Sequence, residues 1–319
     1  MRRIKWWLRG LSQNCFPKFT LAILAHRTWV LEPEVALIPL LSRRKGVAVD
    51  AGANKGVFLY HFARHYQRVL GFEPLPQLAT YLQNAAPPNA TVHALALSDA
   101  EGIATLRLPK GLIELGSLEA HTAETWTTTA EVETHDVQLK SLDSFDLAQL
   151  DLFKIDVEGH ELTVLEGARE TLQRCKPTIL VEVEERHRAG GVHQLCTQLE
   201  ELGYAGFFLD GLRLRSVGDF DLGRDQNVAS LENSVKVSRY INNFIFFPRN
   251  EAAGRVAAIR RALEGRTKLE LAPALVPGHA VTLRERFAGP LYAVRDVLFA
   301  PGPLVSPGLG SSLVSRDAP

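Results

Sequence analysis

The stretch from Val47 to Gly56 constrains this chain most, because it joins an apolar run to a loop with two glycines. The apolar run ends in Asp50, and Gly52 and Gly56 flank a tight bend ahead of a helix-like segment at 57–65. This pattern predicts a buried strand, a loop and a helix. Glycine lets a backbone approach a ligand closely, and the start of the following helix presents unpaired N–H groups at the same place.

The loop motif D-x-G-x-N-x-G narrows the choice of ligand. It is neither the G-x-G-x-x-G of dinucleotide-binding proteins nor the Gly-Lys-Ser/Thr ending of a P-loop, so a loop that holds phosphates is not expected. Asp50 at the start of the loop suits a ligand that carries an ammonium and a sulfonium. An ordinary strand–turn–helix without a ligand is the alternative.

Composition excludes several classes of protein. The chain has 319 residues, 46% apolar and 23% charged, as ordinary soluble globular proteins have. A formal net charge of zero gives no basic field for a nucleic-acid partner. Three cysteines without metal-binding spacing, no apolar run that could span a membrane, and no signal peptide together predict a cytoplasmic protein.

Seven segments are typical of the strands of one mostly parallel sheet, namely residues 47–50, 69–73, 91–97, 150–156, 177–184, 204–209 and 240–247. Two shorter strands are expected at 103–108 and 137–142. Helical segments, among them 78–86, 162–172 and 192–202, lie between the strands. Strands that alternate with helices predict an α/β fold, and ligands of such sheets bind at the carboxyl ends of the strands.

Polar residues follow the second and third strands at that edge. Glu73 ends the second strand about 20 positions after Gly52, the spacing expected of an acid that binds a ribose in a nucleoside-binding βαβ unit. After the third strand, Ser98 and Asp99 would lie at the edge of an adenine, where Asp99 would accept from the exocyclic amine. The alternatives are a capping or solvated acid for Glu73 and a plain turn at 98–99.

The strand at 150–156 carries the densest group of chemically active side chains. Four of them alternate around its carboxyl end, namely Lys154, Asp156, Glu158 and His160. Four such side chains at the end of a buried strand are not explained as ordinary solvent-exposed surface residues. With Glu182 and Glu184 on the next strand, Asp156 and Glu158 leave a Mg²⁺-type site open, although we expect no bound metal.

Three regions lie outside this pattern. Residues 1–30 mix basic and aromatic residues, which predicts either helices that pack on the domain or a segment that contacts anionic lipid weakly. Residues 109–133 lack periodicity, which is typical of disorder or of a lid over a substrate. We expect a helix within 249–268 and a largely disordered tail over 269–319, which is rich in proline and glycine.

Several motifs, taken in order, resemble one family. They are VDAGANKG, GFEPLP, ALSD, LDSF, KIDVEGHELTVLEGA, ILVEVEE and NFIFFP. Together they are similar to the FkbM family of S-adenosylmethionine (SAM)-dependent methyltransferases, over residues 31–248. The resemblance implies a Rossmann-like class I methyltransferase fold, with a seven-stranded, mostly parallel sheet, an antiparallel last strand and helices on both faces. It also implies O-methylation of a hydroxyl on a small metabolite or glycan.

The resemblance further implies roles for individual residues. Those that would bind the cofactor are Asp50, Gly52, Ala53, Asn54, Gly56, Glu73, Ser98, Asp99 and Asp156. The catalytic group would be Lys154, Asp156, Glu158 and His160. Many relatives have a small residue at the position of His160, so a role for it would not be shared. A histidine side chain nevertheless suits a general base, because it takes up and releases a proton near neutral pH.

Two other functions and a second base fit the same pattern. The domain could bind SAM or a nucleoside without catalysis. It could also be an NAD-binding oxidoreductase, for which Glu73 fits but the glycine fingerprint is missing. His187 is the second candidate base, although a lone histidine in a loop is more often solvated.

Overall fold

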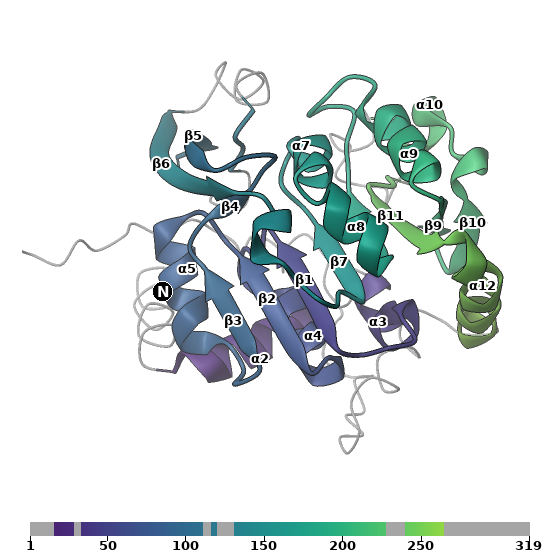
Figure 1. Ribbon diagram of the computed structural model, residues 1–319, viewed down its shortest axis with the longest axis horizontal. Helices are drawn as coiled ribbons and strands as arrows, with labels where there is room; N and C mark the ends of the chain where they lie inside the picture. Colours follow the sequence, from purple (N-terminus) through teal and green to yellow (C-terminus); the bar gives the residue numbers. More distant parts are fainter. Residues whose placement is uncertain (1–15, 29–32, 111–115, 120–130, 228–239, 265–319) are drawn as a thin grey trace, which may run out of the picture.

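The computed structural model describes residues 16–28, 33–110, 116–119, 131–227 and 240–264. Its main element is an eight-stranded sheet in the order β10-β9-β11-β8-β7-β1-β2-β3 (Figure 1). The strands, in chain order, are β1 Val47–Ala51, β2 Arg68–Phe72, β3 Ala90–His93, β7 Leu152–Ile155, β8 Thr178–Glu182, β9 Tyr204–Asp210, β10 Arg213–Ser216 and β11 Asn243–Pro248.

The strand directions confirm the predicted Rossmann-like fold. Strands β3, β2, β1, β7 and β8 are parallel, and β11 lies antiparallel between β8 and β9. The sheet has one strand more than predicted, because β10 turns back at Gly211 and pairs antiparallel with β9. β10 has only four residues, and an alternating pattern over so short a segment is not enough to predict a strand from the sequence.

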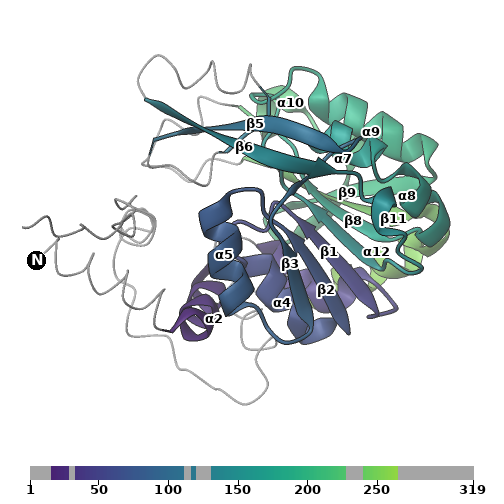
Figure 2. The ribbon, with the colours of Figure 1, turned by 60° about the vertical axis from the view of Figure 1, so that its left-hand side comes forward.

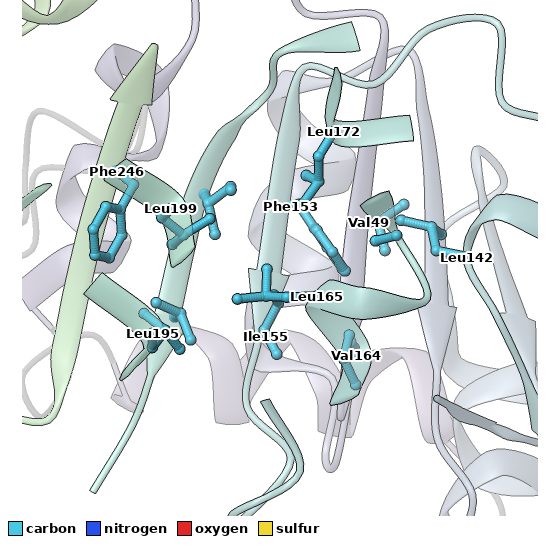
Figure 3. Close-up of a cluster of buried hydrophobic side chains, with 14 of the residues drawn as sticks. Val49, Leu142, Phe153, Ile155, Val164, Leu165, Leu172, Leu195, Leu199 and Phe246 are labelled. Carbon is cyan, nitrogen blue, oxygen red and sulfur yellow. The ribbon is translucent and has the colours of Figure 1, made fainter. Parts of the chain in front are cut away.

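Helices cover both faces of the sheet, as predicted (Figures 1 and 2). One face carries η1 Pro33–Leu37, α3 Ile38–Leu41, α4 Val57–His65, α5 Pro76–Ala85 and α12 Arg249–Leu263. The other carries α7 Glu161–Glu166, α8 Arg169–Cys175 and α9 Gly191–Glu201. On this second face, Leu165, Leu172 and Leu195 pack against Phe153 and Phe246 of the sheet (Figure 3). The remaining short elements are η3 Asp143–Phe145, η4 Val217–Asp219 and α10 Leu222–Asp225.

The predicted third strand at 91–97 is two strands in different sheets. β3 ends at His93, opposite Phe72, because its partner β2 ends there. The chain then forms β4 Ala96–Leu97, which pairs with β6 Val132–Lys140 in a second sheet of order β4-β6-β5. β5 Gly102–Pro109 pairs antiparallel with β6 along its whole length. The two short strands expected at 103–108 and 137–142 are therefore one long hairpin.

The single helix expected over 162–172 is also two helices, α7 and α8, which are separated at Gly167 and Ala168. A Cβ on Gly167 would lie 1.9 Å from the carbonyl oxygen of Ser98. The backbone after α7 thus packs directly on the loop after β4. Periodicity cannot predict this break, because the apolar spacing continues across it.

The terminal regions are described in part. α2 Pro17–Thr28 falls within the N-terminal extension and packs against α4 and α5. α12 falls within the predicted helix at 249–268, and the predicted tail at 269–319 lies outside the described residues. Among the helices that the structure describes, none combines the length and apolarity needed to cross a membrane.

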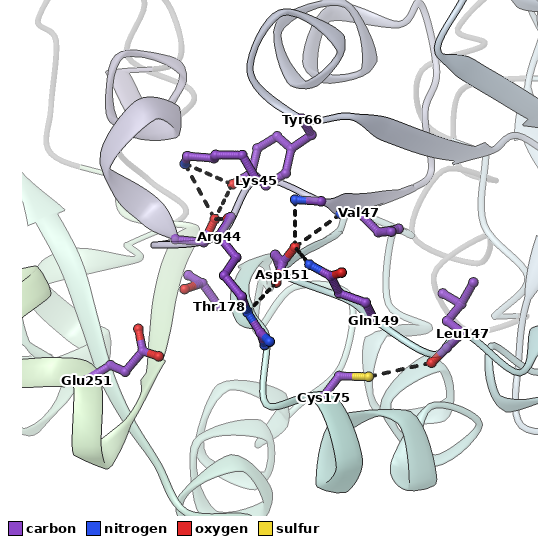
Figure 4. Close-up of polar contacts among 12 residues, drawn as sticks. Arg44, Lys45, Val47, Tyr66, Leu147, Gln149, Asp151, Cys175, Thr178 and Glu251 are labelled. Atoms are coloured by element: carbon purple, nitrogen blue, oxygen red, sulfur yellow. Dashed lines mark hydrogen bonds and ion pairs between the residues drawn. The ribbon is translucent and has the colours of Figure 1, made fainter.

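Asp151 holds the starts of β1 and β7 together (Figure 4). Its Oδ2 atom accepts hydrogen bonds from the backbone N–H groups of Gly46 at 2.8 Å and Val47 at 3.1 Å, and from Gln149 Nε2 at 2.6 Å. Its Oδ1 atom lies 3.2 Å from Arg44 Nε. The carboxylate is buried, so its loss would leave two backbone donors without a partner.

We predict that Asp151→Ala lowers the free energy of unfolding by about 2–4 kcal/mol, because buried donors lose a charged acceptor. Urea denaturation measures this loss. Glu101→Ala is the matched control, since Glu101 pairs with Lys140 at the same 3.2 Å but at the surface. Exposed pairs contribute about 0–1 kcal/mol. Equal losses in the two variants would contradict the assigned role of Asp151.

Candidate active site

Three carboxyl groups meet at the carboxyl ends of neighbouring strands. Asp50 lies in β1, Glu73 directly follows β2, and Asp156 directly follows β7. β1 pairs with both other strands, and Asp50 is in register with Lys154 of β7. The sheet order therefore brings together residues that the sequence separates by a large part of the domain.

The two glycines of the loop after β1 make close packing possible. Gly52 has a φ of +77°, and a Cβ there would lie 1.8 Å from the carbonyl oxygen of Asp156. Gly56 has a φ of +81°, and a Cβ there would lie 2.5 Å from Leu82 Cδ2. From the sequence, these glycines are expected to make room for a ligand. In the structure, atoms of Asp156 and Leu82 already occupy the positions next to the two glycines, so protein packing by itself requires glycine there.

Glu73 fixes the shape of the same loop. Its Oε2 atom accepts from the backbone N–H of Asn54 at 2.8 Å, and its Oε1 atom accepts from that of Leu75 at 2.8 Å. The carboxyl is buried, and burial raises its pKa from the ordinary 4.5 to about 7; the charges of Asp50 and Asp156 contribute to the rise. Each carboxylate oxygen has two acceptor sites, so these bonds leave capacity for ligand hydroxyls.

Asp50 is a buried acid whose carboxyl oxygens form no hydrogen bond of good geometry among the described residues, and the same is true of Asn54 Oδ1. The backbone N–H of Leu59, in the first turn of α4, nevertheless interacts with the Asp50 carboxyl and lowers its pKa. Burial raises the pKa of Asp50 to about 6, although the positive charge of Lys154 opposes the rise. Buried polar groups nearly always have partners, so these atoms indicate a ligand with donor groups.

Lys154 is a buried cation beside these acids. Its Nζ atom lies 2.9 Å from Asp156 Oδ2 and 4.6 Å from the centre of the Phe58 ring. Burial of an ammonium is costly unless it is paired, and Asp156 supplies the pair. Lys154 thus orients Asp156, whose side chain is partly exposed at the edge of the sheet.

His160 lies between the loop after β4 and the segment at 116–119. Its Nε2 atom is 3.0 Å from Ser98 Oγ, and its Nδ1 atom is 2.7 Å from Glu119 Oε1. Ser98 is buried and donates to Asp99 Oδ1 at 3.1 Å, whereas Asp99 is exposed. Both imidazole nitrogens therefore have partners, and His160 is on the side of the predicted adenine position.

Glu158, in the loop after β7, pairs with His187. The distance from His187 Nδ1 to Glu158 Oε2 is 3.2 Å, and both side chains are largely buried. Burial raises the pKa of Glu158 well above its ordinary value, and the charges of Asp156 and Glu184 contribute to the rise. The interpretation of His187 as a solvated loop residue was wrong, because β8 brings the start of its loop alongside β7.

A second polar group adjoins this pair. Glu184 accepts hydrogen bonds from Arg186, with Nη2 at 2.9 Å, and from the Tyr240 hydroxyl. Burial alone would raise the pKa of Glu184, but the bonds and charge of Arg186, followed by the Tyr240 bond, lower it overall. Glu182 accepts from Asn242 Nδ2 at 2.5 Å.

These contacts do not favour the alternative of a Mg²⁺-type site. Each of its four candidate carboxyls already has a side-chain partner. The pairs are Asp156 with Lys154, Glu158 with His187, Glu182 with Asn242, and Glu184 with Arg186. Within the described ranges, no group of three or more His, Cys, Asp or Glu side chains is placed to hold a metal ion.

Sequence reasoning missed four residues of the site. Ser117 Oγ donates to the Glu158 carbonyl at 2.5 Å, and Glu119 binds His160. Both come from the non-periodic segment 109–133, where nothing distinguishes them; residues 111–115 and 120–130 lie outside the described residues. Tyr240 and Glu161 were also missed. Glu161 accepts from the Gly159 N–H at 2.8 Å, and burial raises its pKa to about 7.

The mostly parallel sheet with helices on both faces is the Rossmann-like fold that the resemblance predicts. Residues 50–205, just under half of the chain, match the family described as the methyltransferase FkbM domain. This match confirms the predicted resemblance over these residues.

Three individual proteins are similar to parts of this chain. "Methyltransferase 1" of Beauveria bassiana (strain ARSEF 2860) is 27% identical over 179 residues, which cover 49% of this chain and 71% of the relative. A methyltransferase FkbM structure from Methylobacillus flagellatus KT is 18% identical, with a TM-score of 0.40, over 76% of this chain and 61% of that one. A TehB-like SAM-dependent methyltransferase from Corynebacterium glutamicum ATCC 13032 Kitasato is 15% identical, with a TM-score of 0.33, over 57% of this chain and 84% of that one.

The buried carboxyls predict a pH dependence of stability. The folded-state pKa of Glu73 is about 7 and its ordinary value is 4.5, so between these values the folded state holds more protons than the unfolded state. The contribution of Glu73 to the free energy of unfolding is therefore largest below its unfolded-state pKa, and it is lost as pH rises through its folded-state pKa. For Glu73 the loss is about 1–3 kcal/mol.

Urea denaturation of wild type and Glu73→Gln from pH 4.5 to pH 8 isolates this contribution, because the glutamine does not titrate. We expect the wild type to lose stability relative to the variant as pH rises. Parallel curves would show that Glu73 titrates normally in the folded protein.

Proposed function

We propose that this protein is a SAM-dependent O-methyltransferase that acts on a hydroxyl of a small metabolite or glycan. The observation that carries the proposal is the buried Asp50 carboxyl beside Glu73 and Asp156, with no side-chain hydrogen bond to either oxygen. A group of acids at the carboxyl edge of a parallel sheet suits a cationic nucleoside. The match to the methyltransferase FkbM domain family supports the same cofactor.

The residues present fit SAM at the level of their chemistry. Asp50 and Asn54 supply buried acceptor oxygens for an ammonium group, and Glu73 supplies acceptor sites for ribose hydroxyls. Ser98 and Asp99 are the residues we assign to the adenine side. The loop at 52–56 is held by Glu73 and by bonds from the N–H groups of Gly52 and Ala53 to the Phe72 carbonyl, so its shape is set before a ligand binds.

When bound, SAM supplies a methyl group activated by a sulfonium. The contribution of the protein is then alignment of the acceptor oxygen and exclusion of water. Lys154 holds Asp156 at the edge where the acceptor would approach. Glu158 and the Glu184–Arg186–Tyr240 group, near the ends of β7 and β8, would contact an acceptor rich in hydroxyls.

A hydroxyl acceptor must also lose its proton. We assign this step to His160 in the tautomer whose Nδ1–H donates to Glu119, so that Nε2 is unprotonated. The Ser98 hydroxyl can donate to Nε2 or to Asp99 Oδ1, and it would donate to Asp99 when the acceptor hydroxyl takes its place at Nε2. His187, oriented by Glu158, is the second candidate, because it is buried against Glu158 rather than solvated. General-base help contributes typically ~10²–10⁴-fold to rate.

We predict that Asp50→Asn weakens SAM binding about 10–100-fold, because a charged hydrogen bond of about 1.5–3 kcal/mol is lost. Isothermal titration calorimetry with SAM, its demethylated product and NADH measures this and separates the methyltransferase from an oxidoreductase. Asp136→Asn is the matched control, since Asp136 lies exposed in β6. NADH binding with no response to SAM would overturn the proposal.

Transfer of label from methyl-labelled SAM to a panel of hydroxyl compounds separates an enzyme from a SAM-binding module. With an acceptor from that panel, we expect Asp156→Ala to abolish turnover. We expect His160→Ala to lower kcat about 10²–10⁴-fold while SAM affinity is retained. If kcat is unchanged in His160→Ala and falls in His187→Ala, the base is His187.

A further inference from the structure

Helix α2 has apolar residues on both of its faces. On the inner face, Leu21 and Ala25 are fully buried. Leu21 lies next to the cofactor loop, since a Cβ built on Gly56 would be 3.2 Å from its Cδ1 atom. The Ala25 carbonyl lies 3.1 Å from His61 Nε2 of α4. This face anchors α2 to the domain (Figure 2).

The outer face of α2, together with Phe16 directly before it, exposes a stripe of large apolar side chains. Phe16 and Phe19 are each 66% exposed, and Ile23 is 40% exposed. Their spacing of three and four residues places them on one side of the helix. A helix with apolar residues on two opposite faces normally packs on both sides, and the domain covers only one face of α2. Of the five large apolar residues that stand out as exposed in the described chain, three belong to this stripe.

The charge of the flanking sequence indicates what covers the stripe. The first 31 residues contain the basic residues Arg2, Arg3, Lys5, Arg9, Lys18 and Arg27 and no acidic residue. The whole chain has a net charge of zero, so this end is a local concentration of positive charge. Trp6 and Trp7 lie in the same stretch. Aromatic side chains together with cations are the chemistry that binds the interface of an anionic bilayer.

We propose that the outer face of α2 and the basic segment before it attach the protein peripherally to an anionic membrane surface. The phenylalanines would insert at the level of the headgroups, and the cations would be attracted to the lipid charge. A second copy of the chain is a less favourable occupant, because two such surfaces would bring like charges together. The proposal does not depend on the proposed catalytic function.

Vesicle co-sedimentation of the full-length protein tests it. The vesicles are phosphatidylcholine alone and phosphatidylcholine mixed with phosphatidylglycerol, at low and at high salt. We expect the protein to bind the anionic vesicles, with binding weakened by salt. The double variant F16S/F19S should bind at least about tenfold more weakly, because two interfacial anchors are lost. The variant I103S is the matched control, since Ile103 is 68% exposed in β5, and it should bind as wild type does.

A second variant separates charge from apolar contact. Replacement of Arg2, Arg3, Lys5 and Arg9 by serine should remove the preference for anionic over neutral vesicles. Wild type that does not bind anionic vesicles, or F16S/F19S that binds as tightly as wild type, would overturn the proposal. So would a dimer in size-exclusion chromatography that depends on Phe16 and Phe19 and does not bind vesicles. Calorimetry with SAM on the same proteins reports the cofactor site separately.

Discussion

The close approach of the loop after β1 to the end of β7 is the contact on which the site depends. Gly52 lies so near the Asp156 carbonyl that a Cβ would be 1.8 Å from that oxygen. Because of this contact, the acids that end β1 and β7 share one small space, and Glu73 joins them from β2. A side chain at Gly52 would separate the strand ends and also require an unfavourable positive φ.

Burial of these acids disfavours their charged forms. It raises the pKa of Asp50 to about 6 and the pKa values of Glu73 and Glu161 to about 7. Lys154 is the buried cation that offsets this charge. Buried acids with raised pKa values concentrate at functional sites, where a cationic ligand stabilises their charged forms.

The sequence by itself predicted the alternation of strands and helices and, through its resemblance to the FkbM family, the antiparallel last strand. Apolar runs such as 150–156 and the spacing from Gly52 to Glu73 are local signals, and local signals are readable without coordinates. The motif KIDVEGHE likewise identified the cluster at the end of β7. The apolar spacing of the segment 162–172 continues across Gly167. It therefore predicted one helix, whereas the structure has two, α7 and α8.

Only the tertiary structure decided which partners the cluster has. Glu158 pairs with His187 because β8 lies beside β7, and His160 lies between Ser98 and Glu119 because the second sheet brings residues 116–119 across the edge. These contacts join residues far apart in the chain and depend on side-chain direction and burial. Neither composition nor periodicity encodes those quantities at a single position, so the sequence could name the acids and histidines but not their pairing.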